Sequence, residues 1–165
     1  MVSDSIGCRF WAVIVLSLAS AAWAAAAPAR VRTVIEAPAE AEPTIRRALK
    51  LLPRPPKQVS VVGAEQDGPD SRQRFARSEA FYSSGSPVVY ITSHSPVLDG
   101  ARQGSSIHVH ALAAIIWHEM AHIDGADEAQ AQKREESLWT RFVRDGAVDR
   151  VTALRYLKAL NDRRH

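Results

Sequence analysis

Cysteine is almost absent from this chain. Cys8 is the only cysteine among 165 residues, so an intrachain disulfide framework is excluded. A single thiol also excludes zinc modules that use several thiolate ligands. Cys8 precedes the long apolar run, whereas the cysteine of a lipoprotein anchor would follow it. Cys8 would also be removed with the signal peptide predicted below, so a metal site in the mature protein is expected to use His, Asp or Glu side chains.

An excess of either charge is lacking as well. Lys and Arg number 21 against 18 Asp and Glu, which gives a formal net charge of +3. The basic residues are scattered, and no aromatic residues alternate with them as in a nucleic-acid surface. We therefore expect no nucleic-acid partner.

Long apolar runs are limited to the N-terminus. Residues 10–27 carry no charge, follow Arg9 and contain the small-residue sequence Ala22-Trp23-Ala24. This is the layout of a secretory signal peptide, predicted here as residues 1–24, and it indicates a secreted or periplasmic protein. An uncleaved membrane anchor is the alternative, because 18 residues reach the lower limit for a span. Residues 25–165 are then long enough for a single domain.

Proline and glycine are missing from a central stretch, Ile107 to Asp124, whose middle is strongly apolar. Such a stretch predicts a buried helix. Its second half contains His118-Glu119-Met120-Ala121-His122, the H-E-x-x-H pattern. Two histidines four residues apart lie on nearly the same face of a helix, so His118 and His122 can bind one zinc ion. Glu119 is then the expected general base that takes a proton from a metal-activated water.

A catalytic zinc usually has three protein ligands, so a third is needed. Gly125 is suited to end the helix, because glycine readily adopts a left-handed conformation. In an unbroken helix Glu128 would point about 240° away from His122, but a reversal at Gly125 would bring it back. We therefore predict Glu128 as the third ligand. Other acidic residues are rivals, with Glu135 the most serious because it follows Glu128 by two helical turns: Asp124, Asp127, Glu135 and Glu136.

Residues 115–132, Ile-Ile-Trp-His-Glu-Met-Ala-His-Ile-Asp-Gly-Ala-Asp-Glu-Ala-Gln-Ala-Gln, resemble the active-site core of zincin metallopeptidases. Glu128 followed by Ala131 resembles the gluzincin branch, which takes its third ligand from the next helix. The spacing also resembles that of metzincins with Glu in place of the last His, but their downstream methionine turn has no counterpart among Met1 and Met120. The resemblance implies a zincin-like domain and hydrolysis of a peptide or protein substrate.

The other segments predict an α+β domain with a short mixed or antiparallel sheet, which packs on the H-E-x-x-H helix together with two C-terminal helices. Residues 87–92 are expected to be an edge strand that an extended peptide can pair with, and a loop is expected around Gly68-Pro69-Asp70. The predicted strands are 31–35, 58–62, 77–82 and 87–92, and the further helices are 43–52, 127–144 and 148–161.

Several other side chains are weaker candidates. His94, Tyr90 and Tyr156 can stabilise a reaction intermediate if they lie near the metal. His108 and His110 lie more than two turns before His118 and are expected at the surface or the helix start. The sequence therefore predicts a zinc metallopeptidase with ligands His118, His122 and Glu128. The alternatives are a non-catalytic, secreted zinc-binding or interaction domain, and a metal-free helical domain with a chance motif.

Overall fold

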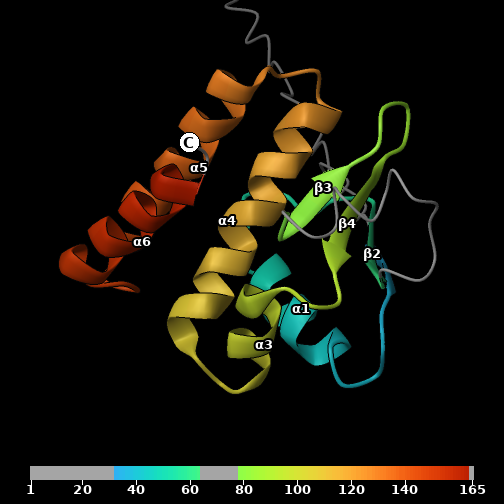
Figure 1. Ribbon diagram of the computed structural model, residues 1–165, viewed down its shortest axis with the longest axis horizontal. Helices are drawn as coiled ribbons and strands as arrows, with labels where there is room; N and C mark the ends of the chain where they lie inside the picture. The colour runs from blue at the N-terminus through green and yellow to red at the C-terminus, as the bar shows by residue number, and fades with distance from the viewer. Residues whose placement is uncertain (1–31, 64–77, 164–165) are drawn as a thin grey trace, which may run out of the picture. The chain divides into compact units, whose positions relative to one another are not determined.

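A computed structural model describes residues 32–63 and 78–163, which form an α+β fold with five helices and a four-stranded mixed sheet (Figure 1). The predicted signal peptide and the loop around Gly68-Pro69-Asp70 lie outside these residues. In chain order the elements are β1 (Val34–Glu36), α1 (Glu42–Leu49), β2 (Gln58–Val62), β3 (Ala80–Tyr82), β4 (Val88–Thr92), α3 (Pro96–Arg102), α4 (Ser106–Ile123), α5 (Glu128–Arg144) and α6 (Arg150–Arg163).

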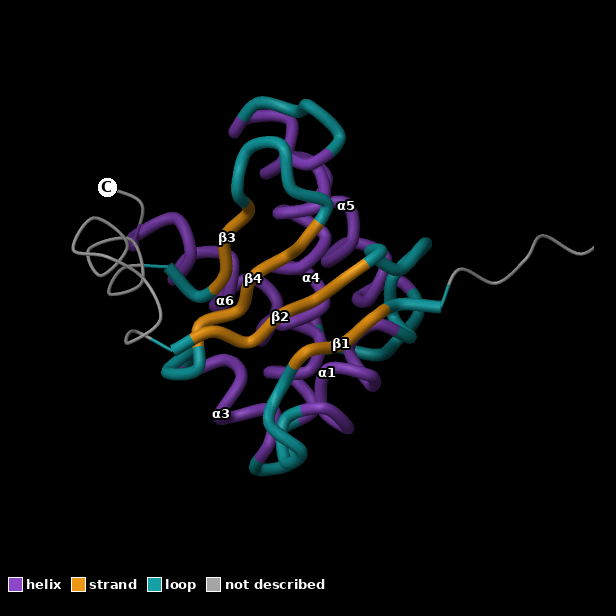
Figure 2. The backbone as a smooth tube through the Cα atoms, turned by 90° about the vertical axis from the view of Figure 1, so that its right-hand side faces the viewer, coloured by secondary structure: helices purple, strands orange, loops and turns teal. Residues whose placement is uncertain are grey.

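The sheet has the order β1-β2-β4-β3, and Figure 2 shows its strands in front of the helices. β1, β2 and β4 are parallel, and β3 pairs antiparallel with β4. The prediction that residues 87–92 form an edge strand is therefore wrong, because β4 lies between two strands. Val89 and Ile91 are completely buried, as a strand flanked on both sides requires. Among the described strands, β3 is the edge strand that contacts α4.

The first helix, α1, packs its apolar face into the core. Pro43 stands at the start of α1, where its missing N–H has no helical partner to lose. Ile45, Ala48 and Leu49 are buried in the core. The helix ends at Leu49, earlier than predicted, and Leu52 is buried from the turn that follows.

Helix α3 was not predicted. It begins after Ser95, whose hydroxyl accepts a hydrogen bond from the backbone N–H of Leu98, and Pro96 occupies the first turn. This cap and proline are a recognisable helix start, but the run that follows is only seven residues long. The helix gains its stability from packing against α4, where Leu98 and Ala101 are buried.

Helix α4 is the centre of the fold and is confirmed as a buried helix. It contacts α5, α3, α1 and β3. Its middle, residues 111–116, is entirely buried, which follows from its nearly continuous apolar sequence. In the part of the chain that the structure describes, no helix is sufficiently long and apolar to span a membrane.

The two C-terminal helices are present, but their packing differs from the prediction. The apolar spacing of residues 127–144 predicts Leu138, Trp139, Phe142 and Val143 as the buried side of α5, and the first three are buried whereas Val143 is partly buried. The apolar spacing of residues 148–161 predicts Val151 and Leu154 on a buried face, but in α6 both residues are more than half exposed. The ring of Tyr156 lies against Trp139 of α5, with 4.7 Å between ring centroids. α6 therefore turns its Ala153 and Tyr156 side towards the core, because the large aromatic ring fills the space beside α5.

Candidate metal centre

The chain reverses direction directly after His122. Gly125 has a φ of 88°, and its N–H donates to the carbonyl of His122 at 2.9 Å. The next N–H, from Ala126, donates to the carbonyl of Ala121 at 2.9 Å. These two bonds form a Schellman motif, which satisfies carbonyl groups left over at a helix end. The predicted break at Gly125 is confirmed, and it sends the chain back along α4.

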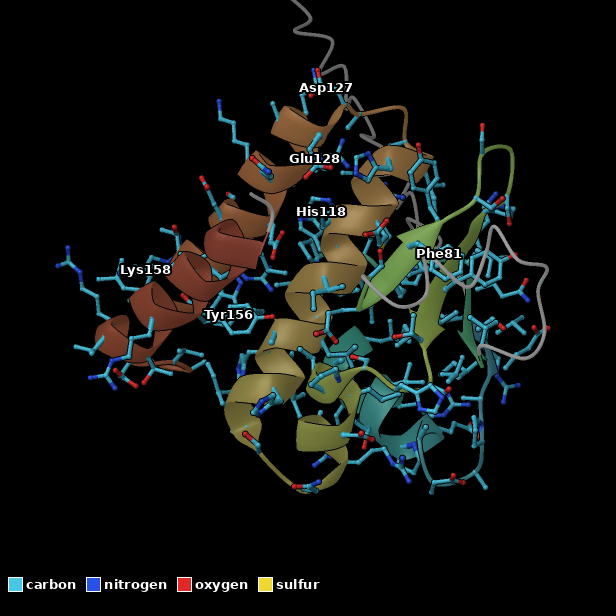
Figure 3. The ribbon with its side chains drawn as sticks, viewed as in Figure 1. Phe81, His118, Asp127, Glu128, Tyr156 and Lys158 are labelled. Atoms are coloured by element: carbon cyan, nitrogen blue, oxygen red, sulfur yellow. The ribbon has the colours of Figure 1, made fainter. Side chains whose placement is uncertain are left out.

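Helix α5 starts immediately after this reversal. The side chain of Asp127 accepts a hydrogen bond from the N–H of Gln130 at 2.8 Å, and the Gln130 side chain accepts one from the N–H of Asp127. This capping box defines the first turn of the helix. Asp127 is therefore occupied as a cap, and Glu128 is the first helical residue. Figure 3 shows Glu128 at the start of α5 and His118 on α4 facing each other.

The structure brings His118, His122 and Glu128 together. Each offers one ligand atom, and these atoms lie within 4.8 Å of one another. The two Nε2 atoms of the histidines are 3.2 Å apart. Glu128 Oε2 lies 3.5 Å from His118 Nε2 and 3.3 Å from His122 Nε2. The two imidazoles and the carboxylate therefore face a common point.

Each of the three side chains is also held from its other polar atom. His118 Nδ1 lies 3.0 Å from Glu135 Oε2, and His122 Nδ1 lies 3.0 Å from the carbonyl oxygen of Ala126. Gln132 donates to Glu128 Oε1 at 3.1 Å. Carboxylate and carbonyl oxygens only accept, so a hydrogen on Nδ1 of each imidazole fits these contacts and leaves the Nε2 lone pairs facing the cluster.

This arrangement places two lone pairs and a carboxylate oxygen against each other. Such groups repel unless a positive charge lies among them. Burial by itself would lower the pKa of His118, but the hydrogen bond to Glu135 and the negative charges of Glu135, Glu119 and Glu128 raise the pKa above 6.5. The site can therefore hold a cation, either a proton or a metal ion. Three N and O donors with ordered outer contacts are the donor set that zinc uses in catalytic sites.

Glu135, the main rival for the third ligand, contacts the opposite nitrogen of His118. Its residue surface is only 2% exposed, whereas the Glu128 side chain is 58% exposed. Glu135 thus lies behind the imidazole, and Glu128 lies at the solvent side of the cluster. Among the described residues, only the three side chains named above form a group that can hold a metal ion.

Asp124 is engaged elsewhere. Its carboxylate accepts hydrogen bonds from Arg54 and, at 2.7 Å, from Arg134. Partial burial opposes ionisation, but the two guanidinium groups dominate and lower the pKa of Asp124. The guanidinium of Arg54 also lies 5.9 Å from the centre of the Trp117 ring. Through these contacts, Arg54 in the loop after α1 and Arg134 on α5 are both connected to the C-terminal end of α4. Glu136, the last rival, is exposed on α5.

The weaker candidates do not join the cluster. His94 is exposed after β4, and Tyr90 stacks on Phe81 with 5.1 Å between centroids. Tyr156 packs on Trp139. His108 remains at the helix start, where Nδ1 lies 2.7 Å from the hydroxyl of Ser105.

His110 is not at the surface as predicted. It is buried, with Nδ1 2.8 Å from the carbonyl oxygen of Ser106 and its ring against the edge of Phe142. That local hydrogen bond satisfies its polar atom, so the ring can pack as a core side chain.

Sequence reasoning missed Tyr82. It lies at the end of β3 and stacks on His122, with ring centroids 5.0 Å apart and an interplanar angle of 17°. Tyr82 pairs with Val89 across the sheet and so shares its face with the helices. Neighbouring residues on a strand face opposite sides of the sheet, so the sequence could show that Tyr82 and Phe81 lie on different faces. Only the packing of β3 against α4 shows that the neighbour of Tyr82 is His122.

Comparisons with protein-family models, with curated proteins and with solved structures found no match. The inferences below therefore depend on the residues and geometry of this chain.

Proposed function

We propose that this protein is a zinc-dependent peptidase with His118, His122 and Glu128 as its metal ligands. The observation that carries the proposal is the convergence of three donor atoms, whose side chains each have a further polar contact on their other side. A cluster in which every donor is oriented in this way is preorganised for a cation. The exposure of Glu128 keeps the site accessible to water and substrate.

Zinc, when bound, would supply the Lewis acidity that makes a coordinated water acidic near neutral pH and polarises a peptide carbonyl. Glu119 is the proposed general base. It follows His118 on α4, is partly exposed, and its charge contributes to the raised pKa of His118. Its carboxylate would accept the proton of the attacking water and return it to the leaving amine nitrogen.

The proposal extends to the fold and the location. An H-E-x-x-H helix beside an antiparallel edge strand, with the third donor on the following helix, supports a minimal zincin-like domain of the gluzincin type. Among the described strands, β3 is the candidate for pairing with an extended substrate. Residues 1–24 support secretion or export to the periplasm, with a membrane anchor as the alternative.

The zinc content of purified protein tests the ligand set. We expect one zinc per chain in the wild type and little zinc in Glu128→Ala. Glu136→Ala is the matched control, because Glu136 is an exposed glutamate on the same helix. Equal zinc content in all three proteins would contradict the role of Glu128.

Hydrolysis is tested with Glu119→Gln and a library of peptides analysed by mass spectrometry. The expected result is cleavage by the wild type and loss of cleavage in the variant, with zinc retained. A non-catalytic zinc domain instead predicts a fourth protein ligand and no cleavage by either protein. Zinc X-ray absorption distinguishes these cases, since an open site shows three protein ligands and one water.

A further inference from the structure

A cavity of about 530 Å³ lies beside the metal cluster. One wall is the hairpin between β3 and β4, residues 82–87, and the other is the end of α4 and its turn, with His122, Ile123, Gly125 and Ala126. We name this cavity the hairpin pocket.

The hairpin pocket adjoins the metal cluster through one side chain. His122 lines the pocket, and its Nε2 lies 3.3 Å from Glu128 Oε2 in the cluster. Tyr82 lines the same pocket and stacks on the His122 ring. The imidazole of His122 therefore lies between a group bound in the pocket and the point that the three donor atoms share. Such a place suits a substrate side chain next to the bond that is cleaved.

The chemistry of the lining is neutral. None of the described residues that line it is Lys, Arg, Asp or Glu. Hydroxyl groups come from Tyr82 and three serines of the hairpin, and the turn around Gly125 supplies backbone groups. A charged side chain entering this pocket would lose part of its hydration and find no ionic partner among the described lining residues, which is unfavourable. An uncharged side chain with a hydroxyl or amide group can instead exchange hydrogen bonds with water for bonds to the lining.

The hairpin that lines the pocket contains a regular turn at residues 83–86. The N–H of Ser86 donates to the carbonyl of Ser83 at 2.9 Å, and Gly85 has a φ of 81°. A positive φ at the third residue is the mark of a type II turn. Ser84 stands at the second position of that turn and is exposed, so its side chain can be enlarged without disturbing the core.

We propose that the hairpin pocket is the subsite that selects an uncharged, polar side chain of the peptide substrate. The inference rests on the proposed function, because it takes the occupant to be a peptide. The pocket determines specificity through the absence of charge, and Ser84 is the position at which that specificity can be changed.

The test is peptide binding to zinc-loaded Glu119→Gln, followed by NMR of the ¹⁵N-labelled protein. The probes are hexapeptides that differ at a single position, which carries Gln, Glu or Lys, and each position is scanned in turn. At one position we expect the Gln peptide to bind at least about fivefold more tightly than the other two. The amide signals of Ser84, Gly85 and Gly125 should shift as it binds.

Ser84→Arg in the same background should reverse the selection. An added positive charge at close range in a hydrated pocket changes affinity about fivefold, so the Glu peptide should gain that factor relative to the Gln peptide. Ser137→Arg is the matched control, since Ser137 is an exposed serine on α5 outside the pocket. The control should leave the ratio of the two affinities unchanged.

Equal affinities for the three peptides, unshifted hairpin signals, or the same effect from both arginine variants would overturn the inference. Glu119-dependent cleavage by the wild type, without selection at any position, would overturn the subsite and leave the peptidase proposal standing. Selective binding in the pocket without Glu119-dependent cleavage would support the subsite and overturn the hydrolytic function.

Discussion

The carboxylate of Glu135 lies 3.0 Å from Nδ1 of His118, on the side of the ring opposite Nε2 and Glu128. Glu135 is buried in the interface between α5 and α4. It lies where it can accept a hydrogen from Nδ1 and so hold the His118 ring in one orientation. In metal proteins such an outer carboxylate also increases the basicity of the histidine ligand.

We expect Glu135→Gln to bind zinc about 10 to 100 times more weakly than the wild type, as loss of outer-shell partners generally does. The amide keeps a hydrogen-bond acceptor but removes the negative charge. Competition with a chelator of known affinity measures the change. Glu136→Gln is the control, because it removes the same charge from an exposed neighbour on α5; a similar loss in both variants would contradict the assigned role.

A substitution at Gly125 should affect both the stability of the backbone turn and the affinity for zinc. Alanine at its φ of 88° should lower the free energy of unfolding by about 1 to 2 kcal/mol, because the left-handed conformation is unfavourable for a side chain with a Cβ. A shift of the turn to relieve this strain would move Glu128 and weaken zinc binding. Chemical denaturation and zinc titration measure the two effects.

Gly146 provides the matched control for Gly125. It ends α5 with a φ of 70° and with the same pair of hydrogen bonds, from Gly146 to Val143 and from Ala147 to Phe142. Gly146→Ala should lose a similar free energy of unfolding and keep its zinc affinity. Unchanged zinc affinity in Gly125→Ala would show that the position of Glu128 does not depend on this turn.

Gly100 allows α3 to approach α4 closely. A Cβ at this position would lie 2.6 Å from the His108 ring, so Gly100→Ala should reduce the free energy of unfolding by about 1 to 3 kcal/mol. In a His108→Ala background the same substitution should stabilise the protein by about 0.5 to 1 kcal/mol, because alanine favours a helix over glycine. A double-mutant cycle of unfolding free energies measures this reversal of sign.

The Asp149 cap should make the stability of α6 depend on pH in the acid range. Its hydrogen bonds with Thr152, first with the side chain and then with the backbone N–H, lower the pKa of the carboxyl below 3.8. The ionised cap thus stabilises α6 above the unfolded value of 3.8, and this contribution is lost as the pH falls through the lowered folded pKa. Signals of α6 amides in an NMR pH titration should report fraying in that range.

Asp149→Asn is the control for this titration, since asparagine is a good helix cap that does not ionise. The variant should lack the acid-induced step specific to α6. Persistence of that step in Asp149→Asn would assign it to another group.

The sequence predicts the structure correctly where interactions between neighbouring residues decide it. β2 has the predicted bounds, because a run of alternating β-branched residues between prolines and a glycine favours a strand. The helix ends at Gly125 and Gly146 follow from backbone conformations that glycine adopts without strain. Local patterns could not show that β4 is interior, since strand order depends on which distant segments pair.

The sequence by itself determined that His118 and His122 share a helical face, because a fixed helical repeat leaves no other outcome. It also restricted the third donor to a few acidic residues after Gly125. Only the tertiary structure decided among them: the packing of α5 on α4 places Glu128 beside both Nε2 atoms and Glu135 behind His118. The angle between two helices depends on the side chains at their whole interface, and no spacing along the chain specifies it.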